Sequence, residues 1–339
     1  MQTPEIQDVS VLSTEVVGSF RSFSHGSDRM IQLSDGSLLL INTRPDKPST
    51  IFRVKPETGK VSKVKVPIDG ESWVVSVPPD RLLIAEPNSN NAALWNAVTG
   101  HIVLLDIQIP RGSTVCADSF KDKLYIIVNW NVSGCGGGFE WSDDDTYLAV
   151  FDIRKERFLK PFNAVKDHDM RAIVIQNKNR MIGFGYGRAN HYVGLFNRKL
   201  EWKLADHKDR YAFSMSHGHS VDFVGSDVER SLIMFGQKGN DKERAVLRWT
   251  LAKRRFEVVG VIENTDLFFK CALPLADNSI LIFCWERFTQ HYTIFQYKMG
   301  APLRIVGRLL DTPVCCAAQG ADDRIYVAGR GMVSVLNLP

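Results

Sequence analysis

One repeated pattern constrains the fold of this chain more than any other feature of its sequence. Seven segments each consist of a short apolar run, a tight polar turn and a second apolar run, and a further hairpin follows each of the first six. The turns are SDG, PPD, KDK, NKN, DVE, ADN and ADD, and their centres lie about 43 to 56 residues apart. Such residues favour hairpin turns, and this repeat length is typical of propeller blades.

Each complete repeat therefore predicts four strands. The seventh repeat has only three, ending at residues 332–337, and one unmatched strand at residues 9–19 precedes the first repeat. Pairing these two ends would remove an open sheet edge. We predict an all-β fold with a single domain over residues 1–339, a seven-bladed β-propeller with four-stranded antiparallel blades. Two β-sandwiches are the alternative, but they predict no constant unit length.

The third strand of five repeats carries an aromatic residue near its end. These residues are Trp95, Phe151, Phe196, Trp249 and Phe295. Their regular recurrence predicts a packing layer between neighbouring blades.

Composition excludes several classes of partner. The chain has 42 basic and 38 acidic residues, without a block of five like charges, whereas nucleic-acid binding needs a clustered basic stripe. No apolar run reaches the roughly 18 residues of a membrane span. The N-terminal stretch lacks the basic head and apolar core of a signal peptide. The six cysteines show no CxxC spacing and sit mostly in apolar runs, which predicts buried thiols in a cytoplasmic or nuclear protein, not a secreted one.

A long glycine-rich stretch, WNVSGCGGGFEWSDDDT, covers residues 130–146. It connects the second and third strands of one repeat. A phosphate-binding loop would lead into a helix and carry a lysine, and a calcium loop would alternate its aspartates, so we favour neither. A loop that contacts a partner protein and a plain surface insertion both remain open.

Long segments gather on one expected face, where strand two connects to strand three and where one blade connects to the next. Arginine, tryptophan and tyrosine dominate protein-binding hot spots, and they are frequent in these segments. We predict partner-binding residues at Arg44, Trp130, Trp141, Arg188, Tyr211, Trp285 and Arg287.

Four histidines of the same loops form the basis of a competing hypothesis. The segments SHGSD (24–28) and SHGHS (216–220) repeat a local pattern just before a first strand. If the loops converge over the channel mouth, His25, His168, His217 and His219 could meet. Imidazoles brought together bind zinc or copper, or act as acid and base. The alternative function is therefore a metal- or histidine-dependent enzyme, although we predict no resident metal or cofactor.

The segments ALWNAVTGHIVLL (93–105) and YLAVFDIRKERFLKP (147–161) resemble β-propellers of the kelch and F-box-associated kind. This resemblance implies that the propeller holds a protein substrate for a ligase. The kelch Gly-Gly doublet after strand two is absent here, and so is an F-box-like helical segment upstream. No GxSxG, HExxH or Walker pattern occurs, so we expect a non-enzymatic interaction or scaffold module. It would be a monomeric propeller, either alone or within a larger complex. A carbohydrate-binding propeller with exposed tryptophans is a third hypothesis.

Overall fold

The structure is a computed structural model of the 339-residue chain. It describes residues 10–19, 27–44, 47–68, 72–111, 114–129, 146–164, 169–177, 180–186, 191–196, 202–206, 221–226, 229–237, 244–250, 252–253, 255–262 and 266–338.

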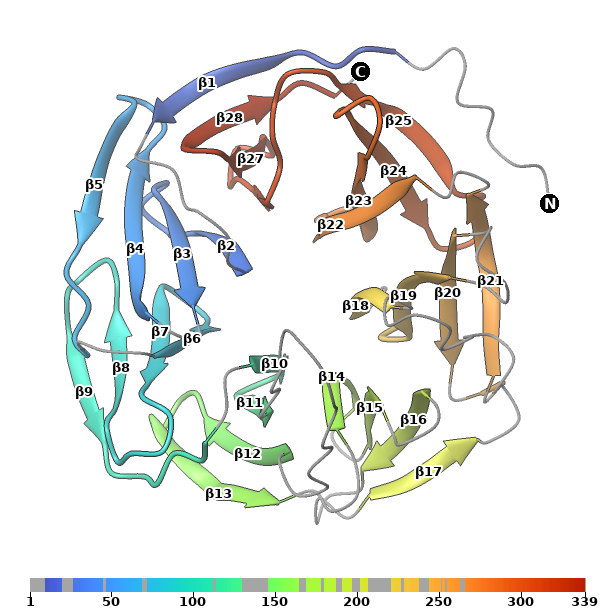
Figure 1. Cartoon of the computed structure of the whole chain (residues 1–339). Coiled ribbons are helices and arrows are strands. Elements are labelled where there is room, and N and C mark those ends of the chain that lie inside the picture. The colour runs from blue at the N-terminus through green and yellow to red at the C-terminus, as the bar shows by residue number, and fades with distance from the viewer. Residues whose placement is uncertain are drawn as a thin grey trace, which may run out of the picture. The chain divides into compact units, whose positions relative to one another are not determined.

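The fold is an all-β propeller of four-stranded antiparallel blades. Within the described residues the strands form seven such sheets, and in six of them the strands follow one another in chain order (Figure 1). These six sheets are β2 (Ser27–Gln32), β3 (Leu38–Arg44), β4 (Lys47–Lys55) and β5 (Lys60–Val64); β6 (Trp73–Val77), β7 (Arg81–Ala85), β8 (Ala92–Asn96) and β9 (Ile102–Leu105); β10 (Thr114–Phe120), β11 (Lys123–Asn129), β12 (Thr146–Asp152) and β13 (Arg157–Ala164); β14 (Asp169–Asn177), β15 (Arg180–Tyr186), β16 (His191–Phe196) and β17 (Trp202–Asp206); β18 (Val221–Ser226), β19 (Leu232–Gln237), β20 (Arg244–Thr250) and β21 (Arg255–Ile262); and β22 (Leu267–Pro274), β23 (Ser279–Glu286), β24 (Tyr292–Lys298) and β25 (Arg304–Leu309).

The seventh sheet joins the two ends of the chain in the order β1 (Thr14–Ser19), β28 (Met332–Leu336), β27 (Ile325–Gly329) and β26 (Cys316–Gln319). Figure 1 shows β1 lying beside β28. The register pairs Thr14 with Leu336 and Ser19 with Met332. The predicted pairing of residues 9–19 with residues 332–337 is thus confirmed for residues 14–19, and we call this sheet the closing sheet.

The chain divides into two compact units. The first comprises Met1–Asn42, Ile51–Val64 and Lys208–Pro339, and the second comprises Thr43–Thr50 and Lys65–His207. The closing sheet and the sheets β18–β21 and β22–β25 lie in the first unit, whereas β6–β17 lie in the second.

Burial within the sheets explains why the repeats look as they do in sequence. The middle strands β7 and β8 are buried almost throughout, while the outer strand β13 alternates between exposed and half-buried residues. Strands buried on both faces read as continuous apolar runs, and a half-solvated strand alternates. The predicted aromatic packing between blades is confirmed at two of the five positions: Phe151 packs in a core shared by β6–β9 and β10–β13, and Phe295 packs in a core shared by β18–β21 and β22–β25.

The segment before β1 departs from the predicted pairing. Residues 10–12 run parallel to β25 instead of extending the closing sheet: the Leu12 amide donates to the Arg308 carbonyl at 2.8 Å, and the Arg308 amide donates to the Ser10 carbonyl at 3.0 Å. The Leu12 side chain covers Gly307, where an added Cβ would lie 2.4 Å from Leu12 Cγ. The N-terminal segment therefore joins two sheets of the first unit.

Three turns between first and second strands share one geometry. In each, an aspartate side chain accepts the amide of the residue two positions on, as Asp35 does for Ser37 and Asp277 for Ser279, and as Asp322 does for Arg324. The residue after the aspartate has a positive φ, which is +79° at Gly36. The predicted turns SDG, ADN and ADD are thus confirmed, because glycine, asparagine and aspartate tolerate this backbone best.

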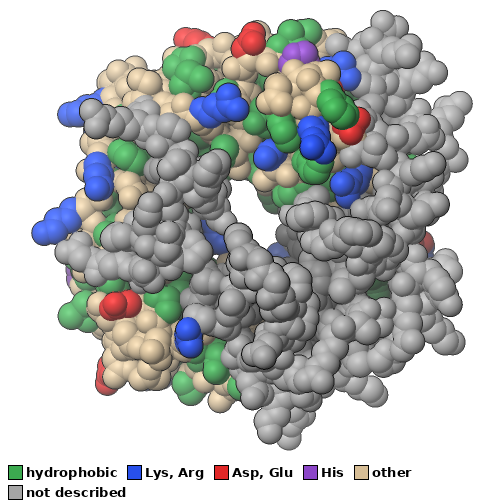
Figure 2. Space-filling view, in the orientation of Figure 1, with side chains coloured by type: hydrophobic (Ala, Val, Ile, Leu, Met, Phe, Trp, Pro, Cys, Tyr) green, Lys and Arg blue, Asp and Glu red, His purple; other side chains and the backbone are tan. Residues whose placement is uncertain are grey.

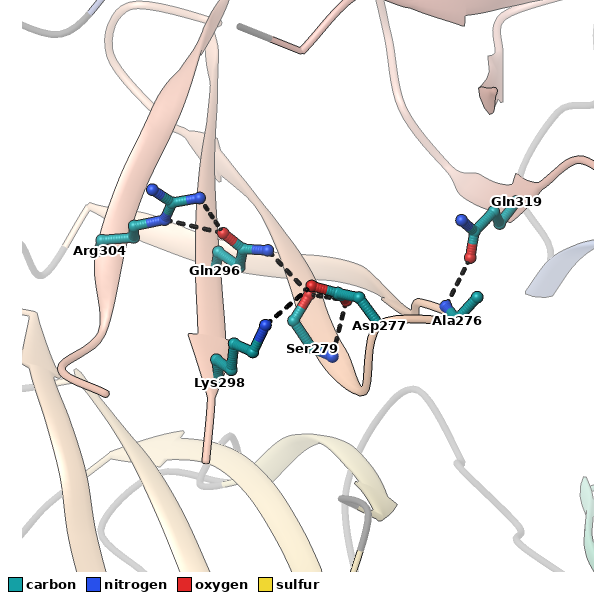
Figure 3. Close-up of polar contacts among 7 residues, drawn as sticks. All are labelled: Ala276, Asp277, Ser279, Gln296, Lys298, Arg304 and Gln319. Carbon is teal, nitrogen blue, oxygen red and sulfur yellow. Dashed lines mark hydrogen bonds and ion pairs between the residues drawn. The ribbon is translucent and has the colours of Figure 1, made fainter. Parts of the chain in front are cut away.

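One of these turns also anchors a polar network that crosses its sheet. Ser279 Oγ donates to Asp277 at 2.6 Å, Lys298 pairs with the same aspartate at 3.3 Å, and the Ala276 amide donates to Gln319 of the closing sheet at 2.7 Å. Figure 3 shows the network continuing from Ser279 through Gln296 to Arg304. This edge of β22–β25 is therefore tied to its neighbour by hydrogen bonds as well as by apolar packing.

The predicted burial of the cysteine thiols is confirmed for two of the five described cysteines. Cys284 and Cys316 are buried, Cys116, Cys271 and Cys315 are half-buried, and none of these five forms a disulfide. Burial raises the pKa of the Cys271 thiol far above its ordinary value, so this group stays protonated and unreactive. Cys135 lies outside the described residues.

Candidate interaction site on the β22–β25 sheet

Two of the seven predicted partner-binding residues have described side chains. Trp285 is the penultimate residue of β23, and Arg287 follows in the hairpin to β24. Arg44 is the last residue of β3, and nothing further is described of it. The remaining four, Trp130, Trp141, Arg188 and Tyr211, lie outside the described residues, as do the histidines His25, His168, His217 and His219.

Trp285 belongs to a cluster of aromatic and cationic side chains. It pairs across the sheet with Phe268 of β22, and their ring centroids lie 5.9 Å apart. The Lys270 ammonium lies 5.1 Å from the centre of the Trp285 ring, and the Arg244 guanidinium carbon lies 5.9 Å from that of Phe268. Each cation faces a ring at a distance where the ring quadrupole attracts it.

The hairpin after β23 follows Trp285 directly in the chain. The Glu286 amide donates to the His291 carbonyl at 2.8 Å, and the Gln290 amide donates back to the Glu286 carbonyl at 2.9 Å. The hairpin of residues 96–101 closes with the same pair of hydrogen bonds. In addition, the Arg287 amide donates to the Asp266 carbonyl at 3.0 Å, which fixes the hairpin against the start of β22.

A buried carboxylate holds the base of this hairpin. Glu286 is only 4% exposed, and it accepts hydrogen bonds from Thr293 at 2.5 Å and Thr289 at 2.7 Å. Arg308 of β25 pairs with it at 3.2 Å. Burial alone would raise the pKa of Glu286, but the two hydroxyls and the guanidinium together bring this pKa below its ordinary value. The carboxylate is therefore charged and satisfied at neutral pH.

The tip of the hairpin carries an exposed aromatic side chain. Phe288 is 77% exposed, and the neighbouring Arg287 is exposed as well. We call Phe268, Lys270, Trp285, Arg287 and Phe288 the aromatic–cationic surface. Figure 2 shows Lys and Arg side chains next to hydrophobic ones at upper right, over the β22–β25 sheet.

Sequence reasoning found part of this surface and missed the rest. Trp285 and Arg287 were predicted from their residue types in a long connection, but Phe268, Lys270 and Phe288 were not. The FxK spacing of Phe268 and Lys270 places both on a first strand, and aligning that strand with WERF would have brought Phe268 opposite Trp285. Burial of Glu286 could not be read from its neighbours in the chain.

The described residues give no positive sign of a metal site or a membrane span. They contain no group of three or more His, Cys, Asp or Glu residues that could hold a metal ion. Within the same described residues no helix is long and apolar enough to cross a membrane.

Comparison with known proteins identifies the fold and no family. No protein-family model and no curated protein matches the chain, so the resemblance to kelch and F-box-associated propellers gains no support. Among solved structures, the chain is similar to a streptogramin B lyase, with a TM-score of 0.63, 10% identity, and coverage of 97% of this chain and 98% of that one. It is also similar to an oligogalacturonate lyase in complex with manganese (TM-score 0.62, 10% identity, 100% and 99% covered).

A third similar structure is that of the RRP9 WD40 repeats, with a TM-score of 0.58, 12% identity, and coverage of 96% of this chain and 100% of that one. These likenesses establish the propeller architecture. At such identities they carry no information about the activity of this chain.

Proposed function

We propose that this chain is a non-enzymatic interaction module that binds a partner protein through the aromatic–cationic surface. In this proposal residues 1–339 form one domain, a closed ring of seven blades, which works as a monomer or within a larger complex in the cytoplasm or nucleus. The remaining residues predicted from the long connections, including Trp141 and Arg188, stay predicted partner-binding residues.

The observation that carries this proposal is the combination of a rigid base with an exposed tip. Glu286 is buried and bonded by three side chains, so the hairpin that presents Phe288 is held in place before any partner arrives. Pre-organised aromatic and arginine residues lose little entropy on binding, which makes them effective anchors in interfaces. The similarity to the RRP9 WD40 repeats is compatible with such a scaffold role.

Affinity purification from cell extract tests this proposal. The native chain is compared with Phe288→Ser and with Leu104→Ser, a matched control because Leu104 is 76% exposed on β9, in the second unit. We expect Phe288→Ser to lose a partner that the native chain and the control retain. Equal recovery of every co-purifying protein by both variants would count against this surface.

A streptogramin B lyase and an oligogalacturonate lyase in complex with manganese are among the similar structures, so we keep an enzyme as the second candidate function. Elemental analysis of the purified full-length chain separates the two functions. A metal site with three or four protein ligands retains its metal through purification, so a metal enzyme would carry about one equivalent. For an interaction module we expect less than about one tenth of an equivalent of any transition metal. A stoichiometric metal lost on changing His217 and His219 to alanine would favour the enzyme.

A further inference from the structure

We propose that the partner contacts the aromatic–cationic surface through an acidic, extended segment whose carboxylates alternate with apolar side chains. This inference rests on the proposed function and adds the chemistry of the partner. The inference follows from which charged side chains of this surface are exposed and which are buried.

Within the aromatic–cationic surface, both exposed charges are positive. Lys270 and Arg287 are exposed, whereas Glu286, the residue before Arg287, is buried and paired with Arg308. Asp266 adjoins the hairpin through its carbonyl, which accepts the Arg287 amide. A partner carboxylate therefore meets cations here, and complementary charge gives both faster association and specificity.

Apolar groups alternate with these cations. Phe288 projects beside Arg287, and Trp285 is half-buried with Lys270 over its ring. A partner side chain that covers Phe288 gains the free energy of removing a large apolar surface from water. An extended segment places successive side chains on opposite faces, so every second residue can reach the surface or its rim.

Single-stranded nucleic acid is the other ligand class that combines negative charge with stacking groups. The surface has few cations, and the chain balances 42 basic residues with 38 acidic ones. Nucleic-acid binding draws on many phosphate contacts along a basic track, so we favour the acidic peptide.

Fluorescence anisotropy tests this inference with a labelled peptide in which Glu alternates with Leu and Phe. We expect saturable binding to the full chain that weakens as salt rises. The double variant Lys270→Glu with Arg287→Glu should bind at least about tenfold more weakly, and Phe288→Ser similarly. Lys63→Glu on β5 and Leu104→Ser should bind like the native chain, because both positions are exposed and Lys63 carries the same charge change elsewhere.

A charge-swapped peptide with Lys in place of Glu makes the result independent of folding. It should bind the double variant and not the native chain. No binding of the acidic peptide by the native chain, or equal binding by the double variant, would overturn the inference, and so would preferential binding of a labelled oligothymidine at the same residues. If Phe288→Ser loses its cellular partner while the charge reversal keeps it, the proposed function stands and the acidic segment does not.

Discussion

At the scale of single residues, two close side-chain contacts contribute to the stability of the first unit. Leu12 lies directly over Gly307, and Glu286 lies among Thr289, Thr293 and Arg308. Neither arrangement is visible in the sequence. Leu12 and Gly307 are far apart in the chain, and Glu286 is of a residue type that is usually exposed. The sequence predicts a strand at each position, but not which side chain fills which space.

Gly307→Ala should destabilise the chain by about 1–3 kcal/mol, because its Cβ would overlap Leu12. Leu12→Ala alone should cost about 2–5 kcal/mol through the cavity it leaves. The double variant should cost clearly less than the sum, because alanine at position 12 makes room for the new methyl group. Urea denaturation of the four proteins measures the coupling, and simple additivity would show that the two residues do not meet in solution.

Glu286→Gln should lower the free energy of unfolding by about 2 kcal/mol, because it leaves the Arg308 guanidinium without its counter-charge. The pH dependence gives a second readout. The pKa of Glu286 in the folded state is below its ordinary value of 4.5. The stabilisation from Glu286 is therefore present above about pH 4.5 and is lost as the pH falls through the folded pKa.

The unfolding free energy of the variant should therefore fall less steeply than that of the native chain below about pH 4.5. Parallel curves for the two proteins would show that Glu286 has no depressed pKa.

At the scale of elements, the hairpins are the best-predicted part of the fold. The Asp at position 35, 277 or 322 and the following left-handed residue together fix the turn, so local sequence is sufficient there. The N-terminal segment shows the opposite case. The sequence predicts a strand over residues 9–19, but the space over Gly307 that admits Leu12, and the hydrogen bonds to Arg308, are visible only in the structure.

Asp277→Ala and Asp35→Ala should each cost about 1 kcal/mol, because each removes a side-chain cap from an equivalent turn. The pKa of each aspartate is below its ordinary value. Burial raises the pKa of Asp35, but the hydrogen bonds from Ser37 outweigh this effect. For Asp277, the hydrogen bond from the Ser279 hydroxyl is the largest cause of the lowered pKa. Asp106→Ala, on an exposed residue, is the control and should be near neutral. Unequal costs in urea denaturation would argue against a shared turn geometry.

At the scale of the whole molecule, the account depends on the closing sheet. The aromatic–cationic surface lies on the sheet that receives residues 10–12 through β25, so the site and the closure share one unit. The predicted pairing of the chain ends was available from counting strands, since three strands at one end require a fourth. The sequence predicts only Trp285 and Arg287 of the aromatic–cationic surface. The pairing of Phe268 with Trp285 depends on the strand register, which the sequence does not show.

Deleting residues 1–19 should lower the melting temperature by more than about 5 °C, because it uncovers the Gly307 side of β25 and leaves β28 as an open edge. A synthetic peptide of residues 10–19, added in excess, should restore part of the loss by mass action. A truncated chain that melts with the native one would show that the closing strand contributes little.

A photo-crosslinking experiment in cell extract tests the central claim most directly. A photoreactive phenylalanine analogue replaces Phe288 in one sample and Leu104 in the other, since the two side chains are equally open to solvent. We predict one discrete crosslinked protein at position 288, lost when Trp285 is also changed to alanine, and none at position 104. Equal crosslinking at both positions, or none at 288, would contradict the assignment of this surface as the binding site.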